Sequence, residues 1–373
     1  MTSAVAINPR MVTFARESRQ MTQKMLAEAS NTSQSSISRA EAGIDRPSAA
    51  AIEAWADVLC YEPGFFEQRD STVLPRTPLF RKRAALKKIA TDAISATLHI
   101  RCHQVDMLAK SVDDVPEDDV PKINLDSEGG TVADAARWVR AKWRVPVGPI
   151  ADMARLVEDH GIVVARLNAV ADAFLGVSIS DVSRHPIILV SDDAPGCRDR
   201  WTLAHELGHI VLHHHRDNYN DNVEELEHEA NAFASEFLMP ANEIKHQFGP
   251  RLDLVELGQL KRHWRTSMQA LIMRAAQLRR ISESQEDRLW RLLSAKGYRR
   301  QEPVDVGIDK VEILDEMVRV HLEDLGFSLR ELAKVLWLRE EEFRRVFLRG
   351  RTSVPSEISG APSESRPRLR LVD

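Results

Sequence analysis

The sequence predicts an α+β protein built from several domains. Its 373 residues are more than twice the length of a typical domain of about 150 residues. Three short apolar runs of β type, IVVARL, FLGVSIS and PIILVS, follow one another between residues 162 and 191. Helical patterns occupy the chain before and after them. Strands gathered between helical stretches favour α+β order over the regular alternation of a parallel sheet.

The composition excludes several classes of protein. The 51 basic and 56 acidic side chains give a formal charge of −5, which excludes a histone-like polycation. The three cysteines, Cys60, Cys102 and Cys197, form no CxxC pair, so neither a disulfide framework nor a thiolate zinc site is expected. The sequence has no run of 18 apolar residues and no apolar signal-peptide core. We therefore expect a cytoplasmic protein without contact to a membrane.

Changes in composition divide the chain into five predicted regions. The first is an all-helical domain. A basic helical segment, with eight basic and two acidic side chains over 71–110, then leads into the acidic linker SVDDVPEDDVP. A helix–sheet–helix region and a helical C-terminal region follow. The last region carries three prolines and five serines and is expected to be disordered. The predicted boundaries are 1–70, 71–130, 131–280, 281–350 and 351–373.

The segment TQKMLAEASNTSQSSISRAEAG at 22–43 predicts two short helices joined by a tight turn. The first helix begins at Thr22 and has apolar side chains on one face. Asn31 lies in the turn, where asparagine tolerates a left-handed conformation better than most residues. The second helix is expected from about Ser33 to Ala42, with Gly43 as its stop. Its outer face is polar with one cation, which suits the major groove of DNA.

This segment and its surroundings resemble the lambda-repressor/Cro class of helix-turn-helix domains. The resemblance departs from the family pattern at Asn31, where glycine is usual, and at Ala40, where a larger apolar residue is usual. It implies a five-helix, all-α domain that binds double-stranded DNA. The matching residues are Arg16, Met21, Thr22, Gln23, Leu26, Ala27, Ser33, Ile37, Ser38, Glu41, Gly43, Pro47, Ser48, Ala56, Leu59, Pro63, Phe65 and Phe66.

By this resemblance, Gln34, Ser35 and Arg39 would face base edges, because amide and guanidinium groups suit bidentate reading of adenine and guanine. Gln23 and Ser36 would hold phosphates. The first 70 residues carry seven basic and nine acidic side chains, which argues against DNA, since phosphate contact favours cations. A module that only dimerises or binds protein is the alternative. The basic 71–110 stretch could supply the missing charge, or it could be a solvated helix face.

The clearest candidate for a catalytic motif is the segment RWTLAHELGHIVLHHH at 200–215. His205 and His209 are four residues apart and therefore project from one face of a helix. Glu206 lies beside the first histidine. This is the HExxH arrangement, in which two imidazoles bind zinc and the carboxylate acts as a general base. A hydrolytic zinc site also requires a third protein ligand and an open position.

The stretch ELEHEANAFASEFLMP at 225–240 predicts a second helix that can supply the third ligand. Glu229 lies on this helix beside an apolar stripe, and a carboxylate facing the two histidines would give a His-His-Glu set. Glu225, one turn earlier, is the alternative ligand. His213 continues the histidine face of the first helix and is a weaker alternative.

The two segments together resemble the ImmA/IrrE metallopeptidase family, over residues 130–275 of the chain. The resemblance implies a zincin-like α+β fold, zinc as the cofactor and Glu229 as the third ligand. Family members typically cleave a repressor of the lambda/Cro class, and many carry such a domain at the N-terminus. The matching residues are Gly148, Pro149, Ile150, Gly161, Ile162, Ile188, Leu189, Val190, Arg200, Thr202, Leu203, Ala204, His205, Glu206, Leu207, Gly208, His209, Glu229, Ala230, Asn231, Phe233, Ala234, Leu238, Met239 and Pro240.

The expected mechanism follows from these residue types. Zinc would polarise the scissile carbonyl and lower the pKa of its bound water. Glu206 would take the water proton and pass it to the leaving amine. Arg200, Tyr219 and His185 are candidates to stabilise the oxyanion, by proximity in sequence alone. The FLGVSIS run could pair with an extended substrate as an added strand, or it could be an ordinary sheet strand.

The C-terminal region has apolar residues at helical spacing. Within it, LGFSLRELAKVLWL is similar to the first half of a helix-turn-helix. No recognition helix is evident after this run, so we expect a small helical bundle. The basic 261–300 stretch could touch nucleic acid or cover a surface.

These observations favour a DNA-binding transcriptional regulator that carries a zinc endopeptidase domain. Its substrate would be a repressor, an antitoxin-like protein or the chain itself, and a homodimer is one assembly open to it. The first alternative is a transcription factor whose peptidase-like domain only senses a metal, a ligand or a partner. The second alternative is an antitoxin-like regulator of a neighbouring gene.

Overall fold

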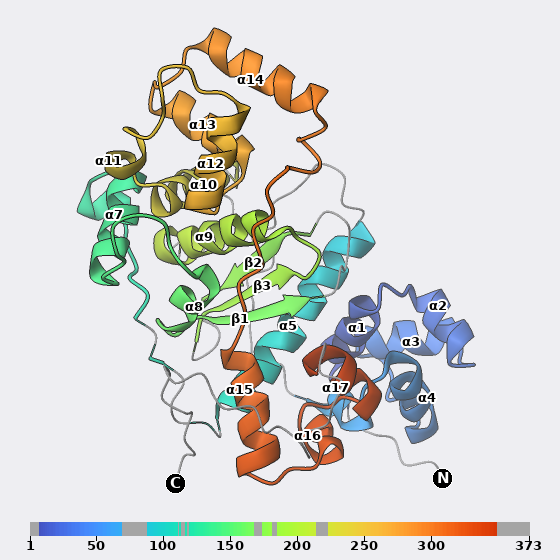
Figure 1. Cartoon of the computed structure of the whole chain (residues 1–373). Helices are drawn as coiled ribbons and strands as arrows, with labels where there is room; N and C mark the ends of the chain where they lie inside the picture. The colour runs from blue at the N-terminus through green and yellow to red at the C-terminus, as the bar shows by residue number, and fades with distance from the viewer. Residues whose placement is uncertain are drawn as a thin grey trace.

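The computed structural model describes residues 7–68, 88–110, 112, 116–117, 119–167, 174–180, 185–213 and 223–348. A helical N-terminal domain, a three-stranded sheet flanked by helices, and helical C-terminal segments follow one another along the chain (Figure 1). The predicted α+β multidomain class is confirmed. The tail 351–373 and nearly all of the basic run 76–88 lie outside the described residues. Within the described part of the chain, no helix is long and apolar enough to cross a bilayer.

Four α-helices and a short 3-10 helix form the N-terminal domain: α1 (Pro9–Ser18), α2 (Gln23–Ala29), α3 (Gln34–Glu41), α4 (Ala49–Leu59) and η1 (Pro63–Glu67). Each α-helix begins after a residue whose side-chain oxygen accepts a backbone N–H of the first turn; these residues are Asn8, Thr22, Ser33 and Ser48. Asn31 has a φ of 51°, the left-handed conformation expected between α2 and α3. The buried Trp55 of α4 donates to Thr32 Oγ1 at 3.0 Å and so holds this turn.

The long helix α5 (Lys88–Ala109) connects the N-terminal domain to the sheet. It packs on α1 and on α15 (Ile313–Arg319). Phe14 of α1 stacks on His99 of α5, with ring centroids 4.4 Å apart. The described part of the predicted basic segment is therefore a packed helix, and the N-terminal domain rests directly on it.

The sheet contains β1 (Val163–Leu167), β2 (Gly176–Ile179) and β3 (Ile187–Ser191), in the order β1-β3-β2. β3 pairs parallel with β1 and antiparallel with β2, so that Ile188 lies opposite both Val164 and Ser178. Val164 and Ile188 belong to one apolar core, whereas Val163 and Leu189 belong to a second core on the opposite face. Burial on both faces explains why the strands read as apolar runs in the sequence.

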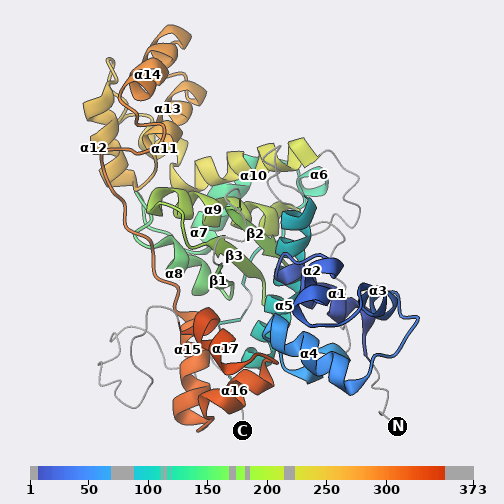
Figure 2. The same cartoon turned by 90° about the vertical axis from the view of Figure 1, so that its right-hand side faces the viewer.

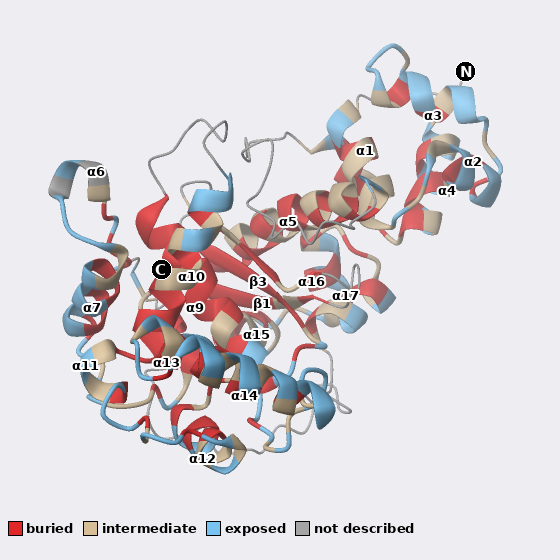
Figure 3. Ribbon diagram, turned by 90° about the horizontal axis from the view of Figure 1, so that it is seen from above, coloured by how far each residue is buried: buried red, intermediate tan, exposed pale blue. Residues whose placement is uncertain are grey.

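Helices cover the first of these faces. α9 (Gly196–Leu212) packs on β2 and β3, and α10 (Val223–Leu238) packs along α9. Gly208 allows this close approach, because a Cβ there would lie 3.1 Å from Phe233 Cβ. Figure 3 shows α9 and the strands as mostly buried and α14 as largely exposed. The other helices of this region are α6 (Leu125–Glu128), α7 (Val132–Lys142), α8 (Met153–Glu158), α11 (Ala241–Ile244), α12 (Leu254–Trp264), α13 (Met268–Gln277) and α14 (Glu283–Ala295).

An extended strap, residues 302–312, returns from α14 across the sheet region to α15 (Figure 1). Asp309 anchors the strap, and its side chain is 2% exposed. It forms ion pairs with Arg200 of α9 and with Arg265, and it accepts the backbone N–H of Met153 at 2.7 Å. Buried charge pairs therefore fix the path of the chain toward its C-terminal helices.

The stretch 281–350, which the sequence suggests as one region, divides in space. α14 packs with α12 and α13, whereas the helices after the strap lie with α5 and the N-terminal domain (Figure 2). These helices are α15, the π-helix η2 (Val320–Asp324), α16 (Leu329–Val335) and α17 (Glu340–Phe347). The N–H of Glu62 donates to Trp337 O at 2.9 Å, and the N–H of Arg339 donates to Cys60 O at 3.2 Å. The turn between α16 and α17 is thus bonded to the segment that follows α4.

One apolar core joins the N-terminal domain, α5, one face of the sheet and the C-terminal helices. At the junction, Arg19 of α1 forms an ion pair of 2.7 Å with the buried Glu342 of α17. Among the described residues, the N-terminal domain and the helices α15 to α17 therefore share one apolar core. Buried members of this shared core include Leu26, Trp55, Leu98, Val163, Leu189, Met317, Leu332 and Phe343.

The helices α16 and α17 repeat the geometry of α2 and α3. Each pair consists of a seven-residue helix, a short turn and an eight-residue helix. Trp337 in the second turn has a φ of 54°, close to the 51° of Asn31 in the first. Ser328 caps α16 as Thr22 caps α2. The sequence predicts helical structure here, as observed, but it shows no recognition helix: the first turn of α17 carries Glu340, Glu341 and Glu342, where α3 carries uncharged polar residues.

Candidate metal centre

Two histidines lie one turn apart on α9, and their Nε2 atoms converge. The side chains of His205 and His209 are 6% and 3% exposed, and their Nε2 atoms are 3.1 Å apart. The apolar positions of α9 face the sheet, and α10 covers the helix from the other side, so both imidazoles are withdrawn from water. The expected pairing of His205 and His209 on one helix face is what the structure shows.

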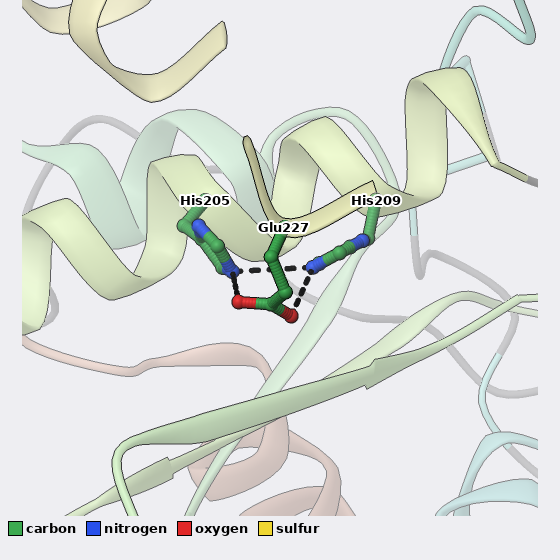
Figure 4. A group of neighbouring side chains, drawn as sticks. All are labelled: His205, His209 and Glu227. Atoms are coloured by element: carbon green, nitrogen blue, oxygen red, sulfur yellow. Dashed lines mark hydrogen bonds and ion pairs between the residues drawn. The ribbon is translucent and has the colours of Figure 1, made fainter. Parts of the chain in front are cut away.

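Glu227 of α10 lies beside both imidazoles (Figure 4). Its Oε2 is 3.6 Å from His205 Nε2, and its Oε1 is 3.4 Å from His209 Nε2. Tetrahedral zinc with bonds of about 2.0–2.1 Å places neighbouring ligand atoms about 3.3–3.5 Å apart, so these donors fit a zinc ion. Among the described residues, they are the one group of three or more His, Cys, Asp or Glu side chains close enough to hold a metal.

Glu229, the ligand implied by the family resemblance, lies outside this group of three. Its Oε2 is 2.9 Å from His213 Nε2 instead. Residues of an α-helix follow one another at about 100°, so Glu227 and Glu229 leave the buried stripe of α10 on opposite sides. Glu225, the alternative ligand, is exposed. The buried stripe itself consists of Leu226, Ala230, Phe233 and Phe237.

Glu206 is buried next to the first histidine and is bonded to the sheet. Ser178 Oγ of β2 donates a hydrogen bond of 2.7 Å to Glu206 Oε2. Burial raises the pKa of Glu206 to about 7, although the neighbouring His209 and the bond from Ser178 lower it. A carboxyl group with a pKa near neutrality can both accept and return a proton at physiological pH.

On the N-terminal domain, the second short helix presents a polar surface. Ser36 is half-buried, and its N–H donates to the Ser33 cap. Gln23 Nε2 donates to Glu41 Oε2 at 2.8 Å, so its amide is held at the start of α2. The exposed side chains of α3 include Gln34, Ser35, Ser38 and Arg39.

Two family models match the chain, one over the helix-turn-helix segment and one over the segment that carries the candidate metal centre. Residues 14–66 match the family model described as helix-turn-helix, and residues 157–276 match the one described as IrrE N-terminal-like domain, a peptidase M78 family. The chain joins an Xre-type helix-turn-helix domain to an IrrE-like domain. Among curated proteins, none matches the chain. The two resemblances seen in the sequence are confirmed, in the order expected.

The IrrE-like domain contains all three strands, α9 and α10, and therefore the whole candidate metal centre. The family is one of metallopeptidases, so a metal is implied, and the two imidazoles and one carboxylate are donors that zinc prefers. The strap 302–312 lies beyond the matched residues. It nevertheless packs on the domain, because Val306 O would lie 2.0 Å from a Cβ at Gly196, the first residue of α9.

The oxyanion candidates differ in their surroundings. Arg200 is fully buried, and its guanidinium forms an ion pair with Asp309 and donates to Ile150 O. The structure thus places Arg200 in the packing of the strap on the IrrE-like domain. His185 is buried just before β3. Tyr219 lies outside the described residues.

Neither Glu227 nor Ser178 is among the site residues that the sequence predicts. A signal for Glu227 exists, since it flanks the same apolar stripe as Glu229, but the stripe alone does not say which flank faces α9. A signal for Ser178 also exists, as a hydroxyl within the apolar run FLGVSIS. Its bond to Glu206 joins residues 28 positions apart and could not be inferred from spacing.

Proposed function

We propose that this chain is a DNA-binding transcriptional regulator whose IrrE-like domain is a zinc endopeptidase. Its substrate is a repressor, an antitoxin-like protein or the chain itself. The observation that carries the proposal is the meeting of His205, His209 and Glu227 at one point, next to the buried carboxyl group of Glu206. The family match supplies the metallopeptidase class, and the helix-turn-helix domain supplies the link to DNA.

Each residue of the centre has a distinct role in this proposal. His205, His209 and Glu227 hold the metal. Zinc in such a site supplies a Lewis acid that polarises a peptide carbonyl and acidifies a water molecule. Glu206 is the general base: it takes a proton from water and returns it to the departing amine, a task suited to its raised pKa of about 7. Ser178 orients the Glu206 carboxylate through the 2.7 Å hydrogen bond.

The DNA-binding half of the proposal rests on the exposed face of α3. Gln34, Ser35 and Arg39 are exposed, although the C-terminal helices pack on the same domain. Amide and guanidinium groups are able to read base edges in the major groove. An operator bound by α3 would bring the IrrE-like domain close to other proteins on that DNA. This proximity supports a DNA-bound repressor as the substrate class.

The test is mass spectrometry of candidate repressors from the same genome after incubation with the zinc-loaded full-length chain. Wild type should release two new peptides from one candidate, or from the chain itself, at a single peptide bond. Glu206→Gln keeps the side-chain shape and removes the base, so it should release neither. Glu225→Gln, an exposed change on α10, serves as the matched control and should cleave normally. Absence of any product with wild type would contradict the peptidase proposal.

A second function, a non-catalytic sensor, is favoured by one observation. The apolar core beneath the sheet continues through α5 into the helix-turn-helix domain, so metal or ligand binding at α9 could alter DNA binding without proteolysis. If the domain is a sensor, Glu206→Gln should leave gene regulation intact, because binding of a metal or ligand needs no proton transfer. The peptidase proposal expects the partner repressor to persist and its target genes to stay off in the same variant.

A further inference from the structure

A chain of polar contacts leads outward from the metal centre. His209 Nδ1 lies 2.9 Å from His213 Nδ1, and His213 Nε2 lies 2.9 Å from Glu229 Oε2. Both histidines are buried; His209 lies in the last turn of α9 and His213 is the residue that caps its end, while the glutamate comes from α10. The nitrogen of His209 that takes part in these contacts is not the one that faces Glu227. This series of contacts therefore reaches His209 through Nδ1, the ring nitrogen that does not face the proposed metal position.

One arrangement of protons satisfies both contacts, from His209 to His213 and from His213 to Glu229. If His209 Nε2 binds a metal, it must keep a lone pair, so its proton resides on Nδ1. That N–H donates to His213 Nδ1, which acts as the acceptor. The proton of His213 then resides on Nε2 and donates to the carboxylate of Glu229. A carboxylate at the end of the chain fixes the tautomer of both rings and leaves His209 Nε2 free for a metal.

We infer that His213 and Glu229 are positioning residues for His209, forming a relay that orients its ring and raises its affinity for the metal. This inference rests on the proposed metal site. In this inference Glu229 supports the ligand His209 through His213, whereas the family resemblance implied that Glu229 itself binds the metal. Groups that accept the second N–H of a metal-bound histidine orient the ring and increase its basicity.

The inference predicts the order of zinc affinities among variants of the full-length chain, measured by competition with a chromophoric chelator at fixed pH. Glu229→Gln and His213→Phe should each weaken zinc binding about 10–100-fold, the usual effect of losing an outer partner of a metal-binding histidine. Glu227→Gln removes a ligand and should weaken binding far more. Glu225→Gln is exposed on the same helix and should bind zinc as wild type does.

The double variant separates a relay from independent contributions. Glu229 acts only through His213 in the relay, so Glu229→Gln should cost nothing further once His213→Phe is present. The Co²⁺ form supplies a second readout, because its visible spectrum reports the ligand set. Glu229→Gln should keep the wild-type spectrum, whereas Glu227→Gln should change it. Circular dichroism of the zinc-free variants checks folding, and His213→Gln replaces His213→Phe if the latter fails to fold.

Several results would overturn the relay. One is a Glu229→Gln variant that loses as much affinity as Glu227→Gln and changes the Co²⁺ spectrum, since Glu229 would then be a ligand. Others are wild-type affinity in Glu229→Gln, or full additivity in the double variant. Proteolysis is not part of this measurement. A wild type that binds zinc but cleaves nothing would contradict only the peptidase proposal, whereas one that binds no zinc would contradict both.

Discussion

Ser178 on β2 and Glu206 on α9 are joined by a hydrogen bond of 2.7 Å between Oγ and Oε2. This bond ties the carboxylate next to the candidate metal centre to a strand that pairs, within the described residues, only with β3. Gly176, two residues earlier on β2, has no room for a Cβ, which would lie 2.3 Å from Thr202 Cγ2. The close packing of β2 on α9 thus fixes where Glu206 is held.

Replacement of Glu206 by Gln should separate zinc binding from catalysis. Zinc content and operator binding should stay near wild type, because Glu206 is not among the three converging donors. Cleavage of the substrate identified by mass spectrometry should fall about 10²–10⁴-fold, the usual contribution of general-base catalysis. Ser178→Ala should lower kcat more mildly, and Ser178→Thr should restore part of it. Wild-type rates in Glu206→Gln would exclude this residue as the base.

Arg39→Ala should weaken specific DNA binding by about 1–3 kcal/mol and relax the preference at one base position, as expected for a lost bidentate contact. Arg344→Ala on α17 is the control, since it is also an exposed arginine on the second helix of a helix-turn-helix geometry. We expect no effect there, because the glutamates of α17 repel phosphates. Gel-shift titrations against a selected operator measure both. Equal losses in the two variants would show that α17 also contacts DNA.

Loss of the Asp309 charge should destabilise the fold. Asp309→Ala leaves the fully buried Arg200 without its ionic partner, and breaking a buried pair from one side typically costs about 3–5 kcal/mol. Denaturant unfolding followed by circular dichroism measures the change. Asp305→Ala on the same strap is exposed and should cost little. Similar midpoints for the two variants would mean that the strap is not anchored by this pair.

The buried His99 should make stability depend on pH. Burial, with a smaller effect of the Arg10 charge, lowers its pKa from 6.5 to about 4. Between these values the unfolded chain binds a proton that the folded chain excludes, so stability is complete above about pH 6.5 and falls toward pH 4. The loss can reach about 3 kcal/mol for one group. His99→Phe should flatten this part of the pH profile of unfolding; an unchanged slope would assign it to other groups.

Local patterns were sufficient to predict much of the fold and half of the candidate site. Thr22, Asn31 and Ser33 are cap and turn residues whose roles depend on the nearest few positions, and the structure places them as expected. The pairing of His205 and His209 likewise follows from helical periodicity alone. These features need no knowledge of how one helix packs on another.

Packing between distant segments could not be predicted in this way. Whether Glu227 or Glu229 faces His205 depends on the rotation of α10 against α9, which Gly208 and Phe233 help to set. The ion pair between Arg200 and Asp309 joins residues 109 positions apart. Helical spacing predicted structure where α17 lies, but not its likeness to α3, because the first turn of α17 is acidic while the helix length and the turn conformation agree.

The shared apolar core has a consequence for building chimaeras. A DNA-binding module joined by a free linker can be exchanged for another by cutting the linker. Here α5 and the helices α16 and α17 supply part of the packing of the N-terminal domain, and Arg19 shares a charge pair with Glu342. A graft that replaces only residues 1–70 would leave the apolar sides of three helices without partners. Transplanting the operator specificity of this protein into a relative therefore requires changing the surface of α3 alone, or carrying α5, α16 and α17 along with the domain.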